Sequence, residues 1–139
     1  MSVHLKRMQP GDEALFQDIA PEVFDEPIHG GRLTAYLSDP DHLMILAFEA
    51  GTVVGQCAAV IHRHPDKTTE LYVDEVGTAS THRRLGIATR LVTAMFDWGR
   101  ELGCTEAWLG TELDNLEANG LYIKLGGKPE TMRYYEFEL

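Results

Sequence analysis

The chain has 139 residues, of which 44% are hydrophobic and 24% charged, and its formal net charge is −10 at pH 7. That length suits one domain around a single buried core, so we expect residues 1–139 to form one domain. The acidity disfavours nucleic acid, whose phosphates require a basic surface, and favours a cationic small molecule or basic peptide as partner. No apolar run approaches the roughly 20 residues that span a bilayer, and the first residues lack the pattern of a secretory signal. We therefore expect a cytoplasmic protein with no membrane partner.

The first forty residues predict a strand followed by helical segments. Apolar and polar residues alternate over 2–7, as in a short strand. Asp12 is a suitable N-cap for a helix whose apolar residues recur at helical spacing, namely Leu15, Phe16, Ile19 and Val23. A further helical turn is expected over 32–37, and we interpret the region around it as a lid over the substrate.

Three strands are expected next. Two apolar runs over 42–50 and 52–62 predict a hairpin, with Gly51 in the turn. A third strand is predicted over 68–78. Because these runs follow one another with short connections, the sheet should be antiparallel up to this point.

The remainder of the chain alternates between helix and strand. Apolar residues recur every three or four positions over 83–102, which predicts a long amphipathic helix ending at Gly103. A short apolar strand is expected over 104–109, a helix over 113–125, and a final strand over 133–139 from its alternation.

Neither the cysteines nor the histidines indicate a metal centre. Cys57 and Cys104 each lie in a strand-like apolar run and are interpreted as buried core residues. His62 and His64 alternate around Arg63 at the polar end of a strand, where surface histidines are the simpler interpretation. We expect no metal cofactor.

The loop before the long helix has the residues of a phosphate-binding cradle. Free N–H groups at a helix start and the positive end of the helix dipole favour an anion. Arg83 and Arg84 add charged donors, Gly86 lets a ligand approach the backbone, and Ala88 keeps the helix close to the strand. These features favour a pyrophosphate, although two arginines at a helix start can equally be a solvated surface.

This loop resembles the signature of the GNAT superfamily of acetyl-CoA-dependent N-acetyltransferases, which reads Gln/Arg-x-x-Gly-x-Gly/Ala. Arg83, Gly86 and Ala88 match it. A second stretch, NLEANGLYIKLG over 115–126, is similar to the family's Asn-x-x-Ala-x-x-Leu-Tyr-x-Lys-Leu-Gly-Phe, with Gly127 standing where Phe is usual. The order of predicted elements is similar to the family's over nearly the whole chain. The resemblance implies an α+β fold: a mostly antiparallel sheet, splayed at a strand bulge, with helices on both faces.

The resemblance also implies which residues bind acetyl-CoA. Main-chain groups at the bulge pair with the pantetheine arm, and the amide of Val76 faces the acetyl carbonyl. Asn115 matches a cofactor-contacting asparagine, although a helix N-cap explains it nearly as well. The implied cofactor-binding set is Val76, Gly77, Thr78, Arg83, Arg84, Leu85, Gly86, Ile87, Ala88, Thr89, Asn115 and Tyr122.

Two residues are candidates for proton transfer. Glu75 is at a position similar to the family's acidic residue, where it could take a proton from the attacking ammonium. Asp74 competes for this role if the bulge changes the strand register. Tyr122 matches the tyrosine that donates a proton to the coenzyme A sulfur, and its alternative role is packing.

The substrate is predicted from charge and from a partial resemblance. Between Pro10 and Ala50 the only strong base is Arg32, among many carboxylates. Such carboxylates suit a polycationic amine, or they serve solubility. The overall layout resembles the aminoglycoside 3-N-acetyltransferases of the superfamily, which implies an aminoglycoside and a role in antibiotic resistance. The residues expected to contact the substrate are Glu22, Asp25, Glu26, Asp74 and Glu75.

Other acceptors stay open at this stage. A different small amine, an amino acid or a peptide N-terminus would fit the same chemistry, and a non-catalytic acetyl-CoA-binding module is a more distant alternative. The resemblance is also compatible with a homodimer.

Overall fold

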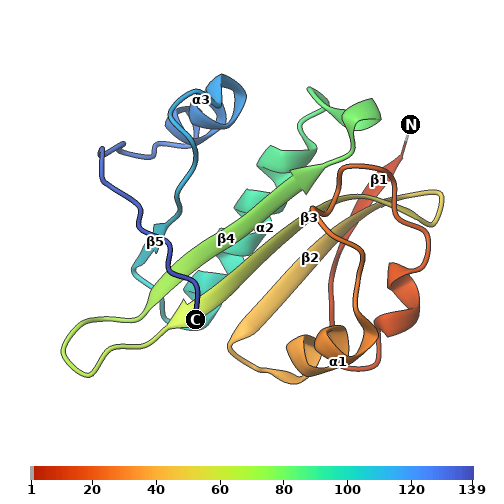
Figure 1. The fold of residues 1–139 in the computed structure, drawn as a ribbon, viewed down its shortest axis with the longest axis horizontal. Coiled ribbons are helices and arrows are strands. Elements are labelled where there is room, and N and C mark those ends of the chain that lie inside the picture. The colour runs from red at the N-terminus through yellow and green to blue at the C-terminus, as the bar shows by residue number, and fades with distance from the viewer. Residues whose placement is uncertain (1) are drawn as a thin grey trace.

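The computed structural model describes residues 2–139 and contains one five-stranded sheet (Figure 1). The strands lie in the order β1-β2-β3-β4-β5, and only β5 runs parallel to its neighbour. Their bounds are β1 Val3–Arg7, β2 His42–Glu49, β3 Thr52–His62, β4 Glu70–Thr78 and β5 Glu106–Trp108. The expected α+β architecture with a mostly antiparallel sheet is confirmed.

The predicted hairpin of β2 and β3 forms the centre of the sheet. Its turn residues Ala50 and Gly51 both have positive φ, 49° and 85°, a backbone twist that matches the twist of paired strands. Both strands are buried along nearly their whole length because helices cover the two faces of the sheet. This explains why their sequences are almost continuously apolar.

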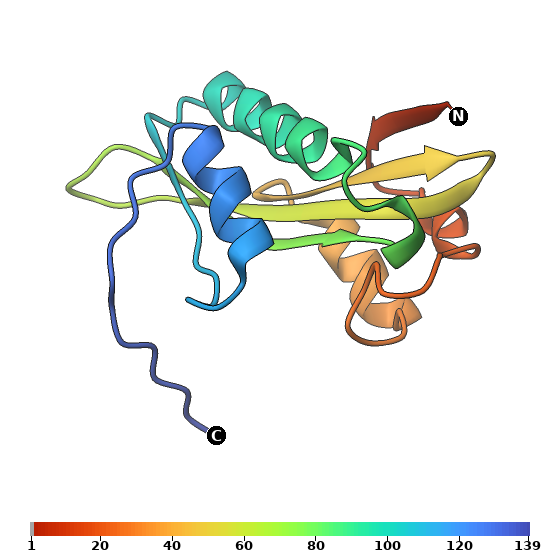
Figure 2. The same ribbon diagram turned by 90° about the horizontal axis from the view of Figure 1, so that it is seen from above.

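Helices α1 (Gly30–Ser38) and α2 (Ile87–Glu101) lie on opposite faces of the sheet (Figure 2). The inner face of α2 is completely buried at Leu91, Val92 and Met95. A Cβ on Gly55 of β3 would lie 3.1 Å from side-chain atoms of Ile87 and Leu91, so this glycine lets α2 pack close to the sheet. The close packing fixes the start of α2 beside the end of β4.

The helix predicted after Asp12 does not form. Only a 3₁₀ turn, η1, is present at Glu13–Phe16. The following backbone instead bonds to β3, with Val53 donating to Asp18 at 2.8 Å and accepting from Ala20 at 2.9 Å. The Asp12 carboxylate binds other donors, Lys6 among them, and does not cap a helix. The strand edge therefore competes successfully with the helix for these backbone groups.

The long helix begins four residues later than expected. The chain passes from β4 through the short 3₁₀ turn η2 (Ser80–His82) and reaches helical geometry only at Ile87. Arg84 and Gly86 have φ of 63° and 78°, which is incompatible with a right-handed helix. The residues predicted as the first helical turn thus form the loop itself.

The last third of the chain is the least buried. Helix α3 (Leu116–Lys124) has no fully buried residue, and β5 is exposed throughout. The strand predicted over 133–139 is wrong: these residues pair with no other strand and lie exposed. Cys104 is likewise only half-buried, in the loop before β5, whereas Cys57 is buried as expected.

No helix within residues 2–139 combines the length and the apolar character that crossing a bilayer requires.

Candidate active site

The site is built around the free edge of β4. Strand β5 pairs with β4 only from Glu70 to Tyr72, so the edge of β4 from Val73 onward has no neighbouring strand on that side. A register shift occurs here as well: Ala58 pairs with Glu75 and Ala59 with Val73. Asp74 is therefore the extra, bulged residue. The bulge therefore lies directly before Glu75 in the sequence.

The second part of the site is the start of α2. The first amide inside this helix to find its usual acceptor is that of Arg90, which donates to the Gly86 carbonyl at 3.1 Å. The amides over 87–89 have no such acceptor and can bind an anion. A Cβ placed on Gly86 would have nothing within 4 Å, so the space over this residue is open to a ligand. The geometry fits the predicted pyrophosphate cradle.

These parts meet in one cavity of about 570 Å³. Most of the predicted residues line it, together with the segment around Val23 and the inner side of α3. The predicted residues in its wall are Glu22, Asp25, Glu75, Val76, Gly77, Thr78, Arg83, Arg84, Gly86, Ile87, Ala88, Thr89, Asn115 and Tyr122. Three predicted residues do not line it, namely Leu85, Glu26 and Asp74. Leu85 is exposed because it lies in the outer part of the loop.

Glu75 is held in place by a buried side chain. Gln56 on β3 is fully buried, and its Nε2 donates to the Glu75 carboxylate at 3.1 Å and to the Val23 carbonyl at 3.3 Å. Burial raises the pKa of Glu75, and the negative charges of Asp25 and Asp74 raise it further, while the hydrogen bond from Gln56 lowers it. A carboxylate with a raised pKa is a better proton acceptor than a solvated one.

The chain that covers β4 here approaches it very closely. A Cβ on Gly77 would lie 2.2 Å from the Val23 carbonyl oxygen, so only glycine fits beneath this segment. Val23 itself is 2% exposed. The segment that carries Glu22 and Asp25 is therefore fixed to the strand that carries Glu75.

Tyr122 reaches the same cavity from α3. It packs against the core, and burial raises the pKa of its hydroxyl, which keeps the proton available for donation. Asn115 is the N-cap of this helix, since its side chain accepts from the Ala118 amide at 3.1 Å. Gly127 ends the turn after the helix, donating to the Tyr122 carbonyl at 2.9 Å, and a Cβ there would be equally close to that oxygen. The unusual glycine thus has a structural reason.

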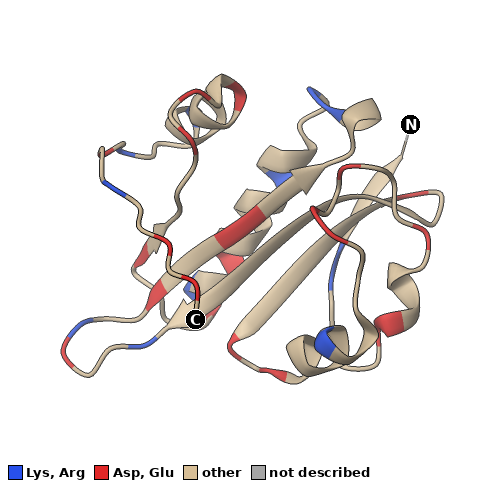
Figure 3. Cartoon of the chain, in the orientation of Figure 1, with Lys and Arg blue, Asp and Glu red and all other residues tan. Residues whose placement is uncertain are grey.

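Fewer carboxylates face the cavity than the sequence suggested. Figure 3 shows basic residues in the loop from β4 to α2 and acidic residues along β4. Glu22 and Arg83 both line the cavity and form an ion pair at 3.2 Å, and Asp25 also lines it. Other acidic residues of the first fifty form contacts elsewhere on the surface, as in Asp12 with Lys6, Asp41 with Arg63, Asp18 with Thr52 and Glu49 with His82.

Gln56 is the residue that sequence reasoning missed. It is the buried polar side chain of an otherwise apolar strand, and its Oε1 has no hydrogen-bond partner within residues 2–139. A lone amide in a continuous apolar run was the available signal, because a buried amide needs partners. Which partner it takes depends on the register of β3 with β4, and that is not readable from the sequence.

Comparison with known proteins identifies the family of the chain. The model of the acetyltransferase (GNAT) family matches residues 12–126, so the chain belongs to this family. It is an acetyl-CoA-dependent N-acetyltransferase, as the sequence motifs predicted.

Individual relatives are more distant. Over 103 residues, 70% of each chain, it is 25% identical to aminoglycoside N(6')-acetyltransferase type 1 of Serratia marcescens. Its fold matches an aminoglycoside acetyltransferase from an uncultured soil metagenomic sample with TM-score 0.83 at 23% identity, covering 100% of this chain and 99% of that one. It also matches AAC(6')-Iy in complex with the bisubstrate analogue CoA-S-monomethyl-acetylneamine with TM-score 0.82 at 18% identity, covering both chains fully. The first and third names specify the 6' position, which differs from the 3-N likeness expected from the sequence.

Proposed function

We propose that this enzyme transfers the acetyl group of acetyl-CoA to a primary amine of a small polycationic substrate, an aminoglycoside. The observation that carries the proposal is the single cavity in which the open start of α2, the free edge of β4, Glu75 and Tyr122 meet. Direct attack of the amine within a ternary complex needs all four parts in one place.

Each part has a role in this proposal. Bound acetyl-CoA supplies an activated thioester. The amides over 87–89 and the side chains of Arg83 and Arg84 bind its pyrophosphate, and main-chain groups from Val76 to Thr78 bind its pantetheine arm. Further predicted contacts are Gly86, Leu85 and Asn115, of which Leu85 lies outside the cavity wall.

Three groups act at the reacting atoms. Glu75 accepts the proton of the substrate ammonium, so that a neutral amine attacks. The amide of Val76 donates to the acetyl carbonyl oxygen, where negative charge develops. Tyr122 donates its proton to the departing sulfur. Asp74 is outside the cavity wall, which favours Glu75 as the base.

The charge near Glu75 supports a polycationic acceptor. Asp25 and Asp74 are close enough to Glu75 to raise its pKa, so three carboxylates share one region. Such a cluster is stabilised by a ligand with several ammonium groups. The names of the relatives point to the same substrate class, and their 6' position is the first regiochemistry to test. Acetylation of such an antibiotic would confer resistance.

Two further parts of the proposal concern the state of the protein. Free Cys57 and Cys104 suit a reducing compartment, which supports the cytoplasm. We also propose that residues 1–139 act as one catalytic domain within a homodimer.

The test is a panel acetylation assay that measures thiol release from acetyl-CoA. Aminoglycosides with and without a 6' amine, polyamines, single-amine sugars, amino acids and peptide N-termini form the panel, and Glu75→Gln is the control for background hydrolysis. Turnover of 6'-amino aminoglycosides above the other amines is expected. Preference for a neutral or singly charged amine would overturn the substrate while leaving the acetyltransferase intact. No turnover despite acetyl-CoA binding would favour a non-catalytic module.

A further inference from the structure

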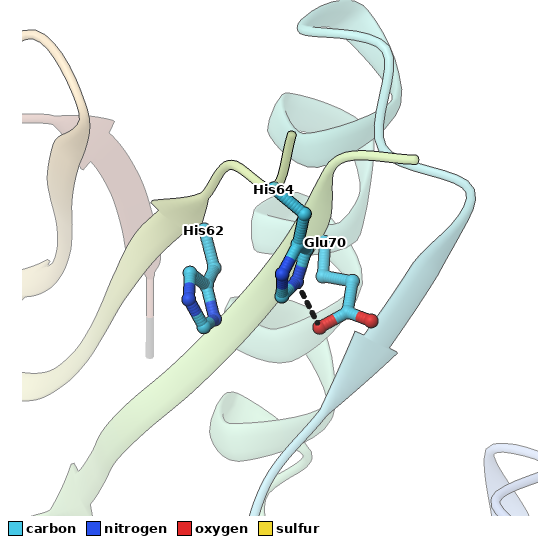
Figure 4. Close-up of side chains that lie close together, drawn as sticks. All are labelled: His62, His64 and Glu70. Atoms are coloured by element: carbon cyan, nitrogen blue, oxygen red, sulfur yellow. Dashed lines mark hydrogen bonds and ion pairs between the residues drawn. The ribbon is translucent and has the colours of Figure 1, made fainter. Parts of the chain in front are cut away.

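Three potential metal ligands meet at the end of the β3–β4 hairpin where the two strands are connected. His62, His64 and Glu70 each bring one nitrogen or oxygen atom to the same spot, and these atoms lie within 4.8 Å of one another (Figure 4). Within residues 2–139 no other group of three histidine, cysteine, aspartate or glutamate side chains gathers so closely. None of the three lines the cavity, so the proposed acetyl transfer gives this cluster no role.

The hairpin brings these side chains together although the sequence separates them. His62 is the last residue of β3, Glu70 is the first residue of β4, and the two are register partners. Register partners project from the same face of a sheet, with Cβ atoms about 4.5–5.5 Å apart. His64 follows in the connection between the strands, and its ring lies 4.3 Å from that of His62 between centroids. Glu70 thus supplies a third ligand that the spacing of the histidines alone does not reveal.

The distances within the cluster suit a tetrahedral ion. Two ligand atoms that each lie about 2.1 Å from a tetrahedral metal are about 3.4 Å apart. His64 Nε2 and Glu70 Oε1 are 3.1 Å apart, which is already close to that separation. His62 is the exposed member of the three, so its ring can rotate toward the other two without disturbing the core. The cluster therefore needs only side-chain rotation to bind an ion.

The charge of the cluster also favours a cation. The Glu70 side chain is only 17% exposed, and its one ion-pair partner within residues 2–139 is His64, which is 16% exposed. A carboxylate that is partly removed from water is stabilised by a cation, whereas a neutral imidazole offers it only a hydrogen bond. The nearby Arg63 pairs with Asp41 instead. A divalent ion between the three side chains would supply the positive charge.

We infer that His62, His64 and Glu70 form a binding site for a divalent transition-metal ion such as Zn²⁺. Two imidazole nitrogens and one carboxylate oxygen are a ligand set that zinc uses with water in the fourth position. Binding requires the Nε2 lone pair of His64, so this imidazole carries its proton on Nδ1 in the metal-bound protein. The ion then replaces the hydrogen bond between His64 and Glu70.

The role that we assign to the ion is structural. It would join the ends of β3 and β4 across the connection 63–69 and oppose opening of the hairpin. Glu70 and Glu75 are separated by roughly 15 Å along β4, so the ion would not contact the reacting groups. An ion that binds only the folded hairpin raises the stability of the protein by mass action. This inference does not depend on the identity of the acceptor amine.

Titration calorimetry with Zn²⁺, and visible absorption with Co²⁺ as a coordination probe, test the site on the full chain without an added histidine tag. One bound ion per chain is expected, and the Co²⁺ spectrum should be that of a four-coordinate ion. Thermal unfolding should move to higher temperature in saturating Zn²⁺ and return to its original temperature when EDTA is added.

Two variants remove one ligand each. His62→Gln should leave the fold intact, because His62 is exposed. It should weaken Zn²⁺ binding by at least about tenfold, which is the lower end of the loss caused by removing an outer-shell partner of a metal ligand. Glu70→Gln keeps a hydrogen-bonding side chain beside His64 and removes the anionic ligand, so it should weaken binding as well. Circular dichroism checks that each variant is folded.

His82→Gln is the matched control. His82 Nε2 lies 3.1 Å from Glu49 Oε1, the same separation as in the His64–Glu70 pair, and the His82 side chain is 15% exposed. Among the described residues 2–139 this second pair has no third ligand beside it. Its loss should therefore leave both the affinity for Zn²⁺ and the number of bound ions unchanged.

Four results would overturn the inference. Absence of heat with Zn²⁺ and of a Co²⁺ spectrum would leave His64 and Glu70 as a simple hydrogen-bonded pair. Binding that is unaffected by His62→Gln or by Glu70→Gln would place the ion elsewhere, for example at the free cysteines. Equal weakening by His82→Gln would show that paired histidines bind zinc here without a defined site. Binding without a rise in the unfolding temperature would contradict the structural role.

Discussion

At the scale of single residues, Gln56 and Asp25 act in opposite directions on the proposed base. Gln56 donates a hydrogen bond that lowers the pKa of Glu75, and the charge of Asp25 raises it. Gln56→Leu should therefore move the acidic limb of the kcat/KM profile to higher pH, because Glu75 then binds its proton more tightly. Asp25→Asn should move the same limb to lower pH.

The measurement is the pH dependence of acetylation with one acceptor amine. Opposite shifts in the two variants support Glu75 as the group that must be ionised. If the acidic limb of each variant stays at the pH found for the parent protein, this limb reports the ionisation of the substrate ammonium, and Glu75 is not the base.

Tyr122 is the second residue whose chemistry can be separated from its packing. Tyr122→Phe keeps the ring and removes only the proton donor, so kcat should fall by about 10²–10⁴-fold while acetyl-CoA affinity changes little. Tyr36→Phe is the comparison variant, since it also removes one tyrosine hydroxyl, which here donates to the Leu43 carbonyl at 3.0 Å and does not line the cavity. That variant should lose stability and keep its turnover.

Single-turnover kinetics and calorimetry with acetyl-CoA make the distinction. An unchanged rate in Tyr122→Phe would assign the tyrosine a packing role. Equal losses of rate in both variants would indicate a general loss of structure.

At the scale of elements, two glycines of the site are required for different structural reasons. A Cβ on Gly77 would collide with the Val23 main chain, whereas a Cβ on Gly86 meets nothing and is disfavoured only by a φ of 78°. Gly86→Ala should cost about 1–2 kcal/mol from the left-handed backbone. Gly77→Ala should cost about 1–3 kcal/mol or more, because the covering segment must move.

Denaturant unfolding measures the loss of stability in the two variants, and steady-state kinetics measure the KM of each for the amine and for acetyl-CoA. Gly77→Ala should raise KM for the amine, since Glu22 and Asp25 move with Val23. Gly86→Ala should raise KM for acetyl-CoA first. An unfolding midpoint for Gly77→Ala equal to that of the parent protein would contradict the close approach at Gly77.

The elements that the sequence predicted well are those with strong local signals. The β2–β3 hairpin was readable because its apolar runs flank a glycine turn, and the amphipathic pattern of α2 fixed its inner face. The residues of the phosphate-binding cradle were predicted for the same reason, because a loop that joins a strand to the following helix is formed by residues close in sequence. Each of these depends on contacts close in sequence.

The elements that were predicted wrongly depend on distant partners. Helical spacing after Asp12 was real, yet Val53, far along the chain, takes the backbone hydrogen bonds of that segment. The bulge at Asp74 exists only through the pairing of β4 with β3. The strand over 133–139 was predicted from its own alternation, but a strand forms only by pairing with another one, and these residues pair with none in the structure.

At the scale of the whole molecule, net charge alone did not identify the substrate site. The chain carries −10, yet the cavity also contains Arg83 and Arg84, and Glu22 is partly neutralised by Arg83. What remains for the amine beside the proposed base is Asp25, which lines the cavity together with Glu75. Acidic residues outside the cavity contribute only a long-range field that salt screens within about 10 Å at 0.1 M.

This distinction gives a prediction for binding of polycations. Asp25→Asn should raise KM for an aminoglycoside by up to about fivefold, which corresponds to the roughly 1 kcal/mol of a partly exposed ion pair. Its effect on a singly charged amine should be smaller, because such a ligand can pair with Glu75 alone. Asp97→Asn is the control: Asp97 lies on α2 outside the cavity and pairs with Arg100 at 3.2 Å. The assays are done at a pH above the acidic limb, so that Glu75 is ionised in every variant. Comparing low and high salt then separates the local effect of Asp25 from the long-range field of the other acidic residues, which salt screens. Equal effects of the two variants on KM would show that only overall acidity attracts the substrate.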